Sequence, residues 1–234
     1  MELKVNQEQI DRLYRFTREH FVEHYDLQTE LVDHLSNAIE EQWRENTKIS
    51  FEDALQKEFK KFGIFGFSDV VEERSKALSK KYHLLIWKHF KAFFSIPKIA
   101  VTATLIVGLF YFFKYIFFYE LMTFGMVFWF LALIVFLIYE RNKMKKRKKQ
   151  TGKKWMFEEI IYGYGSFSGV FAFPLHLINI FSNYGSGVPN DYILWGISVF
   201  LVLLFLGTYI IVKVIPSKAE EYLKQTYPEY SLST

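Results

Sequence analysis

Two histidines one helical turn apart are the first residues of the chain that could support chemistry. The segment His20-Phe21-Val22-Glu23-His24 matches the H-x-x-E-H pattern of inverted zinc proteases. On a helix, His20 and His24 could share a metal ion, and Glu23 could act as the general base. The surrounding helical region is small and leaves little room for a substrate cleft with a positioned third ligand. We therefore expect solvated or core-edge histidines, and a metal-dependent membrane protease is a remote alternative.

A second polar group lies inside a long apolar segment. Gly165, Gly169, His176 and Asn179 follow one another at steps that place them on one face of a helix. Gly165 and Gly169 form a GxxxG pair, which lets two helices approach closely. A titratable histidine on this polar seam could sense or pass a small solute. Ordinary helix packing with interhelical hydrogen bonds explains the same residues, and we favour that explanation.

Other catalytic patterns are missing from the sequence. The chain has no cysteine, which excludes disulfides, thiolate nucleophiles and zinc–cysteine sites. The glycines around position 165 do not form a dinucleotide-binding pattern, because Ser168 stands where a glycine is needed. No phosphate-binding loop or nucleophile elbow is present. We predict a protein that is not an enzyme and needs no cofactor.

The composition divides the chain into an acidic part and a basic, apolar part. Hydrophobic residues make up 51% of the chain and aromatic residues 20%, with 26 phenylalanines. Residues 1–75 carry 17 acidic and 10 basic side chains, whereas residues 76–234 carry 8 acidic and 19 basic ones. Because the positive charge stands beside apolar runs, it predicts a membrane surface and not nucleic acid as the partner. The first residues have no apolar core, so we expect no cleaved signal peptide and a cytosolic N-terminus.

Capping residues followed by apolar stripes predict several short helices in residues 1–82, which we call the head. The first helix is expected over residues 6–24. Ser50 and Asp53 match a capping box, and Gly63 suits the position after the helix that this box begins. No strand pattern of period two is present, so the head is predicted to be a small all-α domain. The expected capping residues are Asn6, Asp26, Ser50 and Ser68.

The membrane part is predicted to contain four helices that form a transmembrane bundle. Residues 83–98 mix aromatic rings with lysines, which is typical of an amphipathic segment at a bilayer surface. The apolar run 97–139 would be about 64 Å long as one helix, about twice the thickness of a bilayer core, so it must form a hairpin. Lys114 and Glu120 fall near its turn, where they can reach water or pair with each other. Within residues 97–216, the predicted spans are about 97–117, 121–139, 159–181 and 192–213.

A basic loop sets the predicted topology. Residues 140–155 carry nine positive charges, which favour the cytosolic side of the membrane. The two expected outer loops contain no lysine or arginine, and Lys213 and Lys218 return the tail, residues 217–234, to the cytosol. Both termini are therefore predicted to be cytosolic. The nine basic residues are Arg141, Lys143, Lys145, Lys146, Arg147, Lys148, Lys149, Lys153 and Lys154.

The head resembles a known family of small helical domains. An acidic helix with Asp33-His34-Leu35 is followed by Ser50-Phe51-Glu52-Asp53-Ala54 and then by Phe62-Gly63, which is similar to the bacterial prefix domain called HAAS. The resemblance covers residues 6–82, and bulky phenylalanines around the glycines depart from the family pattern. Such prefixes precede membrane spans in bacterial proteins associated with PadR-type regulators, including permease-like ones. The resemblance implies a regulatory role and assigns no catalytic residue.

These patterns together predict a regulatory or sensor-like protein of the bacterial inner membrane. The four-helix bundle would hold the head near the membrane, where the head binds a cytosolic regulator or a second copy of the chain. The alternative is a small permease or transporter subunit that uses the polar face of the third span.

Overall fold

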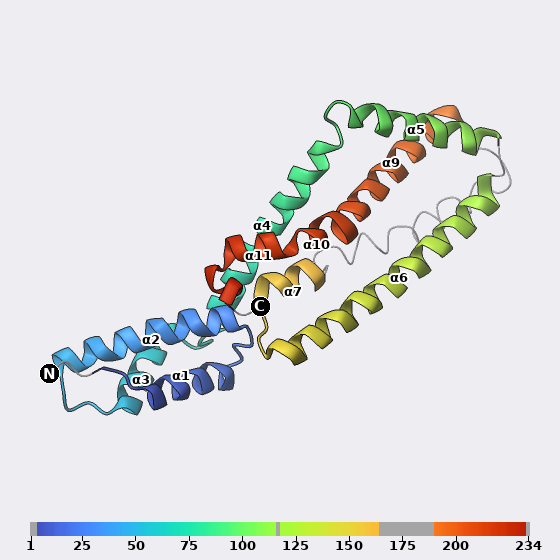
Figure 1. Cartoon of the computed structure of the whole chain (residues 1–234). Coiled ribbons are helices and arrows are strands. Elements are labelled where there is room, and N and C mark those ends of the chain that lie inside the picture. The colour runs from blue at the N-terminus through green and yellow to red at the C-terminus, as the bar shows by residue number, and fades with distance from the viewer. Residues whose placement is uncertain (1–3, 116–117, 164–189, 233–234) are drawn as a thin grey trace.

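The computed structural model describes residues 4–115, 118–163 and 190–232, and this part of the chain is helical with no strand (Figure 1). The all-α fold class is thereby confirmed. The elements are α1 (Gln7–Glu19), α2 (Tyr25–Glu45), α3 (Phe51–Phe59), the 3₁₀ turn η1 (Lys60–Phe62), α4 (Ser68–Ala92), α5 (Lys98–Tyr115), α6 (Phe118–Thr151), α7 (Met156–Gly163), α9 (Asp191–Tyr209), the π-helical turn η3 (Ile210–Val214), α10 (Ile215–Ser217), α11 (Ala219–Thr226) and the 3₁₀ turn η4 (Pro228–Leu232).

Two of the predicted capping motifs begin helices of the head. The side chain of Asn6 accepts a hydrogen bond from the backbone N–H of Gln9 at 2.9 Å, and the Gln9 side chain accepts one from the Asn6 N–H at 2.9 Å. Ser50 Oγ accepts from the Asp53 N–H at 3.1 Å and donates to Asp53 Oδ2 at 2.6 Å. These bonds satisfy donors that the first turn of a helix leaves free, so α1 and α3 begin where the sequence predicts.

The first helix is shorter than predicted. It ends at Glu19 and not near residue 24, because the chain reverses through Phe21, whose φ is 64°, and the Val22 N–H donates to Thr17 O at 3.0 Å. The second helix begins at Tyr25, with His24 in the capping position, so the prediction that Asp26 caps α2 is wrong. Asp26 instead accepts a hydrogen bond from a segment more than a hundred residues away.

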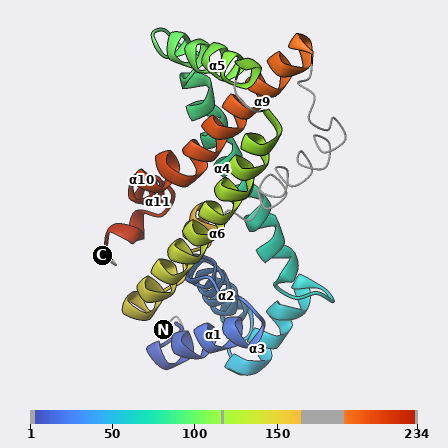
Figure 2. The ribbon, with the colours of Figure 1, turned by 90° about the vertical axis from the view of Figure 1, so that its right-hand side faces the viewer.

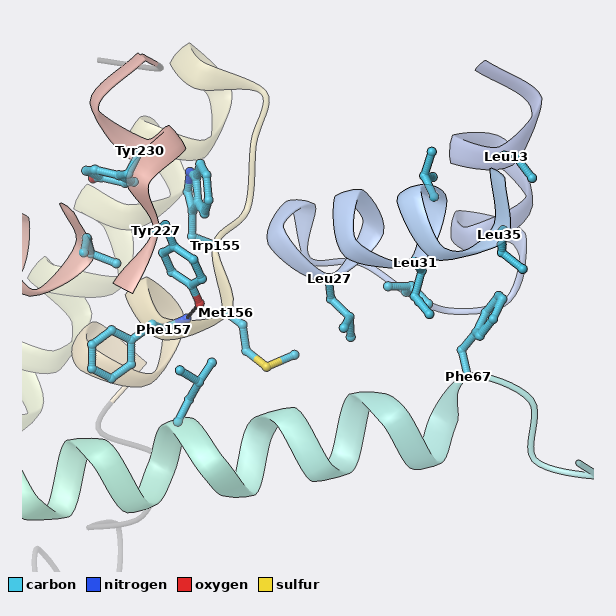
Figure 3. Close-up of a cluster of buried hydrophobic side chains, with 14 of the residues drawn as sticks. Leu13, Leu27, Leu31, Leu35, Phe67, Trp155, Met156, Phe157, Tyr227 and Tyr230 are labelled. Carbon is cyan, nitrogen blue, oxygen red and sulfur yellow. Dashed lines mark hydrogen bonds between the residues drawn. The ribbon is translucent and has the colours of Figure 1, made fainter. Parts of the chain in front are cut away.

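Leucines of α2 form the centre of the head. Leu27, Leu31 and Leu35 lie along the face of α2 that packs against α1 and α4 (Figure 3). Leu13 and Leu35 are fully buried. Next to them, the rings of Phe16 and Phe67 belong to an aromatic cluster that also includes His20 and Phe59.

Helix α4 runs out of the head toward the apolar helices. Residues 83–92, part of the amphipathic segment predicted at 83–98, continue this helix, and α5 begins at Lys98. The α4 side chains Leu78 and Tyr82 are buried in the same core as the head, and α7 and α11 also contribute to that core. The core therefore extends beyond residue 82.

Two helices in the described part of the chain are long and apolar enough to span a membrane. They are Lys98–Tyr115 and the continuous run Asp191–Ser217, and their most apolar windows are only 17% and 33% buried within the structure. They coincide with the spans predicted at 97–117 and 192–213. The span predicted at 121–139 falls within α6, where residues Thr123–Phe136 form a shorter apolar stretch. Most of the span predicted at 159–181 lies outside the described residues.

Helix α6 continues through the basic segment. The loop predicted over residues 140–155 is helical as far as Thr151, and the chain turns only at Gly152, whose φ is 65°. Lysine, arginine, methionine and glutamine are good helix formers, so a charged run of this composition prolongs a helix that already exists. The prediction of a loop over residues 140–151 is therefore wrong.

The apolar helices meet at the end of the molecule opposite the head (Figures 1 and 2). There α5 packs against α9, and the ring of Phe110 stacks on Trp195 with centroids 4.4 Å apart. Lys114 Nζ lies 2.7 Å from Asp191 Oδ2, so an ion pair joins the end of α5 to the start of α9. The sequence predicted that Lys114 lies near the turn, and the structure supplies Asp191 as its partner.

Candidate functional site

The polar contacts of greatest functional interest lie where the head meets the start of α7. We call this site the junction and define it by residues 23–26, residues 153–159 and residues 222–230. The Tyr25 N–H donates to Lys154 O at 2.7 Å, and Asp26 Oδ1 accepts from the Met156 N–H at 3.1 Å. Asp26 thereby binds the first N–H of α7, where the helix dipole favours a carboxylate. Since Gly152 ends α6, only a short segment separates α6 from the head.

Trp155 is the hydrophobic centre of the junction. Its side chain is 3% exposed and contacts the rings of Tyr227 and Tyr230 at centroid distances of 4.9 and 5.4 Å (Figure 3). The ring of Tyr25 lies 5.3 Å from that of Trp155, between centroids. The ammonium of Lys153 lies over the ring of Tyr25, 4.1 Å from its centroid. One tryptophan thus contacts the head on one side and the tail on the other.

An ionic network lies beside Trp155. His24 Nε2 is 2.6 Å from Glu159 Oε2, and Lys154 Nζ is 3.0 Å from the same carboxylate and 2.8 Å from Glu23 Oε2. The hydrogen bond from His24 outweighs burial and, with Lys154, lowers the pKa of Glu159 to about 2. Burial opposes the charge of Lys154, but its bonds to Glu23 and Glu159 prevail and raise its pKa. The network therefore favours the charged forms of Glu159 and Lys154.

The tail packs into the junction from the opposite side. The hydroxyl of Tyr227 accepts a hydrogen bond from the Phe157 N–H at 3.2 Å, and burial together with the nearby Asp26 carboxylate raises the pKa of Tyr227. Farther along, α11 runs antiparallel to α4. Lys81 Nζ donates to Thr226 Oγ1 at 2.8 Å, and His89 Nε2 is 2.7 Å from the Tyr222 hydroxyl. The tail is therefore part of the folded core.

A cavity of about 420 Å³ opens beside the ionic network, between α2, α4 and α7. Its polar lining consists of His24, Glu159 and the hydroxyl groups of Ser75 and Ser79, and the remaining lining is mostly aliphatic. The cavity therefore offers both polar and apolar contacts.

The two histidines of the H-x-x-E-H pattern have separate structural partners. His20 Nδ1 lies 2.8 Å from Phe16 O, and its ring packs against Phe59 with centroids 4.3 Å apart. His24 bonds to Glu159. Because α1 ends before either histidine, the two do not share a helix face. Within residues 4–115, 118–163 and 190–232, no group of three metal-ligating side chains could hold a metal ion.

The remaining predicted site residues fall into two groups. The polar seam of Gly165, Gly169, His176 and Asn179 lies outside the described residues. Of the nine basic residues, seven belong to α6, whereas Lys153 and Lys154 make the specific contacts of the junction. The sequence held one signal for this difference, since Trp155-Met156-Phe157 follows the lysines directly and is fully apolar.

Comparisons with protein-family models, with curated proteins and with solved structures find no match.

Proposed function

We propose that the chain is a multi-pass protein of the bacterial inner membrane with a regulatory head on the cytosolic side. The spans would be α5, the apolar part of α6, a third helix within residues 159–181, and α9 with η3. Glu159 contacts the head, so the third span would begin beyond it. Four spans return the head and the tail to one side of the membrane, which agrees with their common hydrophobic core.

The distribution of charge supports this orientation. On the head side, α6 carries the basic run and the exposed side chains of Lys145 and Lys146, and Lys213 and Lys218 end the last apolar run. On the opposite side, Lys114 is compensated by Asp191. An excess of lysine and arginine favours the cytosolic side of a membrane.

The proposed regulatory role rests on the contacts of the junction. Helices α6 and α7 enter it from the membrane side, and Lys154 and Met156 bond directly to Tyr25 and Asp26 of the head. A buried tryptophan and its ring contacts do not deform continuously, so a displacement of α6 or α7 would reposition the start of α2. The head would bind a cytosolic regulator or a second copy of the chain, and the resemblance to HAAS prefixes implies a regulatory role.

The topology can be tested with single cysteines, because the natural chain contains none. Tyr192→Cys replaces an exposed residue at the far end of α9, and Thr47→Cys replaces an exposed residue of the head. A membrane-impermeant maleimide should label position 192 in intact cells and position 47 only after the membrane is opened. Labelling of position 47 in intact cells, or a chain that is soluble without detergent, would contradict the proposed topology.

The regulatory role can be tested by cross-linking in living cells with the full chain. A photo-cross-linker on Thr47→Cys should give an adduct with a second copy or with a specific cytosolic protein. The same label in a Trp155→Ala chain should give a changed adduct yield, because the junction positions the head. The proposal of coupling is wrong if the yield is unchanged, and the proposal of a partner is wrong if neither chain gives an adduct.

The permease alternative depends on His176 and Asn179, which lie outside the described residues, and it stays a prediction.

A further inference from the structure

A cluster of basic side chains lies where α4 ends, α5 begins and α11 begins. Lys88, Lys98 and Lys218 come from these three places, and all three are exposed. None of them takes part in an ion pair with the described residues. The sequence contains no aspartate or glutamate between positions 74 and 119, nor between positions 192 and 219. Lys88 and Lys98 therefore stand in a segment that supplies no counterion, whereas Glu220 and Glu221 follow Lys218 in the first turn of α11.

Specific contacts hold the three places together. His89 of α4 bonds to the Tyr222 hydroxyl at 2.7 Å, and the Tyr222 N–H donates to Lys218 O at 3.1 Å, which connects α11 to α4. At the other side, Thr102 of α5 donates to Phe93 O at 3.3 Å, and the ammonium of Lys98 lies 5.3 Å from the centroid of the Phe93 ring. The lysines are thus carried by packed elements.

The charges of all three lysines act on His89. Burial, followed by the positive charges of Lys218, Lys88 and Lys98, lowers the pKa of His89. Glu221 is the one acidic group that acts in the opposite direction, and its effect is smaller than that of each lysine. An anion beside the elements that carry these lysines would be attracted by their charges and would reduce their mutual repulsion.

Exposed apolar side chains lie on α4 and in the connection from α4 to α5. Leu84, Trp87 and Ile96 are 60%, 54% and 90% exposed. The ring of Trp87 stacks on Phe90, and the ammonium of Lys91 lies 5.2 Å from the centroid of the Trp87 ring. Tryptophan beside lysine is typical of the level at which lipid headgroups meet acyl chains.

We propose that Lys88, Lys98 and Lys218 bind the phosphate of an anionic phospholipid of the cytosolic leaflet, with its acyl chains against Trp87 and Ile96. The exposed apolar residues favour a lipid over a free phosphate, because a soluble anion would leave them in water. The site rests on the proposed membrane location, since it needs a bilayer at the ends of α4 and α5. It is separate from the basic run of α6.

The test uses the full chain in detergent with phosphatidylglycerol or phosphatidylcholine added, and native mass spectrometry counts the lipids retained. The triple substitution Lys88→Gln, Lys98→Gln and Lys218→Gln should lower the affinity for phosphatidylglycerol on the order of a hundredfold, at about fivefold per lysine near a membrane surface. Binding of phosphatidylcholine should not change. A triple Lys→Arg chain at the same positions should retain the preference.

A matched control removes the same charge elsewhere. Lys48→Gln, Lys57→Gln and Lys60→Gln replace three exposed lysines of the head. If this control loses phosphatidylglycerol as strongly as the first chain, net charge explains the effect and the proposal is wrong. It is equally wrong if neither chain loses the lipid. If glycerol phosphate displaces the lipid at equal concentration, the site recognises free phosphate and the lipid assignment is overturned.

Two further measurements distinguish an unfolded variant from a missing lipid site, and a missing lipid site from a wrong membrane location. Circular dichroism shows whether the triple variant folds. If the triple variant does not fold, Lys98→Gln alone should still lower the affinity for phosphatidylglycerol about fivefold. Insertion of the unaltered chain into phosphatidylcholine nanodiscs tests the membrane location by itself. A chain that inserts but shows no preference for the anionic lipid contradicts only the lipid site, whereas a chain that does not insert contradicts the proposed function.

Discussion

The head and the apolar helices contain the same kinds of side chain in opposite arrangements. Leu13 and Leu35 of the head are fully buried, whereas Leu131 of α6 and Phe205 of α9 are 55% and 58% exposed. In water, this outward arrangement would expose an apolar surface far larger than that of a typical soluble monomer. The first region is arranged as in a protein folded in water, whereas the second has the outward arrangement that the proposed membrane location requires. The comparison predicts that equal substitutions have unequal effects in the two regions.

The largest expected difference concerns two tryptophans. Replacing Trp155, which is 3% exposed, by alanine should cost about 3–5 kcal/mol, because it leaves a large cavity among three tyrosine rings. Trp195→Ala should cost about 1 kcal/mol, since Trp195 is 39% exposed and stacks mainly on Phe110. Denaturant unfolding in detergent measures both. Equal losses would show that the junction is no better packed than the apolar helices.

Replacing one leucine by alanine in the head and one in α6 tests the same difference in burial. Leu35→Ala should destabilise the chain by about 2–5 kcal/mol, because Leu35 is fully buried. Leu131→Ala removes the same atoms from an exposed position and should cost less than about 1 kcal/mol. Thermal unfolding followed by circular dichroism gives both values. A larger loss at Leu131 than at Leu35 would mean that α6 is covered by protein and not by lipid or detergent.

The ionic network of the junction predicts a dependence on pH. The pKa of Glu159 falls from its ordinary value of 4.5 to about 2 on folding, so its contribution is complete above about pH 4.5 and is lost as the pH falls toward 2. Because Glu159 is 44% exposed, solvent screening reduces the contribution to about 1 kcal/mol. Glu159→Gln should remove this acid-sensitive part, whereas Glu229→Gln should preserve it. The free energy of unfolding of both variants is measured between pH 3 and 6. If it depends on pH in the same way for Glu159→Gln and Glu229→Gln, Glu159 is not the group responsible.

The smallest effect is expected at the far end of the apolar helices. Lys114 and Asp191 form an ion pair with partly exposed side chains. Lys114→Ala should lower the thermal midpoint only slightly, and added salt should abolish the difference, because screening weakens exposed pairs. A double-mutant cycle with Asp191→Ala isolates the pair. A coupling that persists in high salt would show that this end is shielded from water.

Much of the head could be predicted from local sequence patterns. Asn6 and Ser50 identify the starts of α1 and α3, because a side-chain cap depends on residues only a few positions apart. The apolar stripe of α2 also follows directly from helical periodicity. The end of α1 could not be predicted, because the polar residues around His20 continue a helical pattern that Phe21 interrupts with a positive φ.

The junction could not be predicted from these patterns, because its contacts join distant parts of the chain. His24 and Glu159 are separated by 135 positions, and Phe157 meets Tyr227 across 70 positions. No periodicity or spacing indicates which of many charged residues will meet. The lysine run made the junction harder to predict, because Lys153 and Lys154 are of the same residue type as many of their neighbours in α6 but make different contacts.

The packing of α11 and η4 on the junction determines the order in which the protein can assemble. Residues 219–232 are synthesised after every apolar helix of the described chain, yet Leu223, Tyr227 and Tyr230 complete the core around Trp155. The N-terminal helices therefore cannot finish folding while they leave the ribosome, as an independent N-terminal domain does. In the proposed membrane topology, completion of the core waits until the last apolar helix has been inserted, so a complete junction would form only in correctly inserted chains.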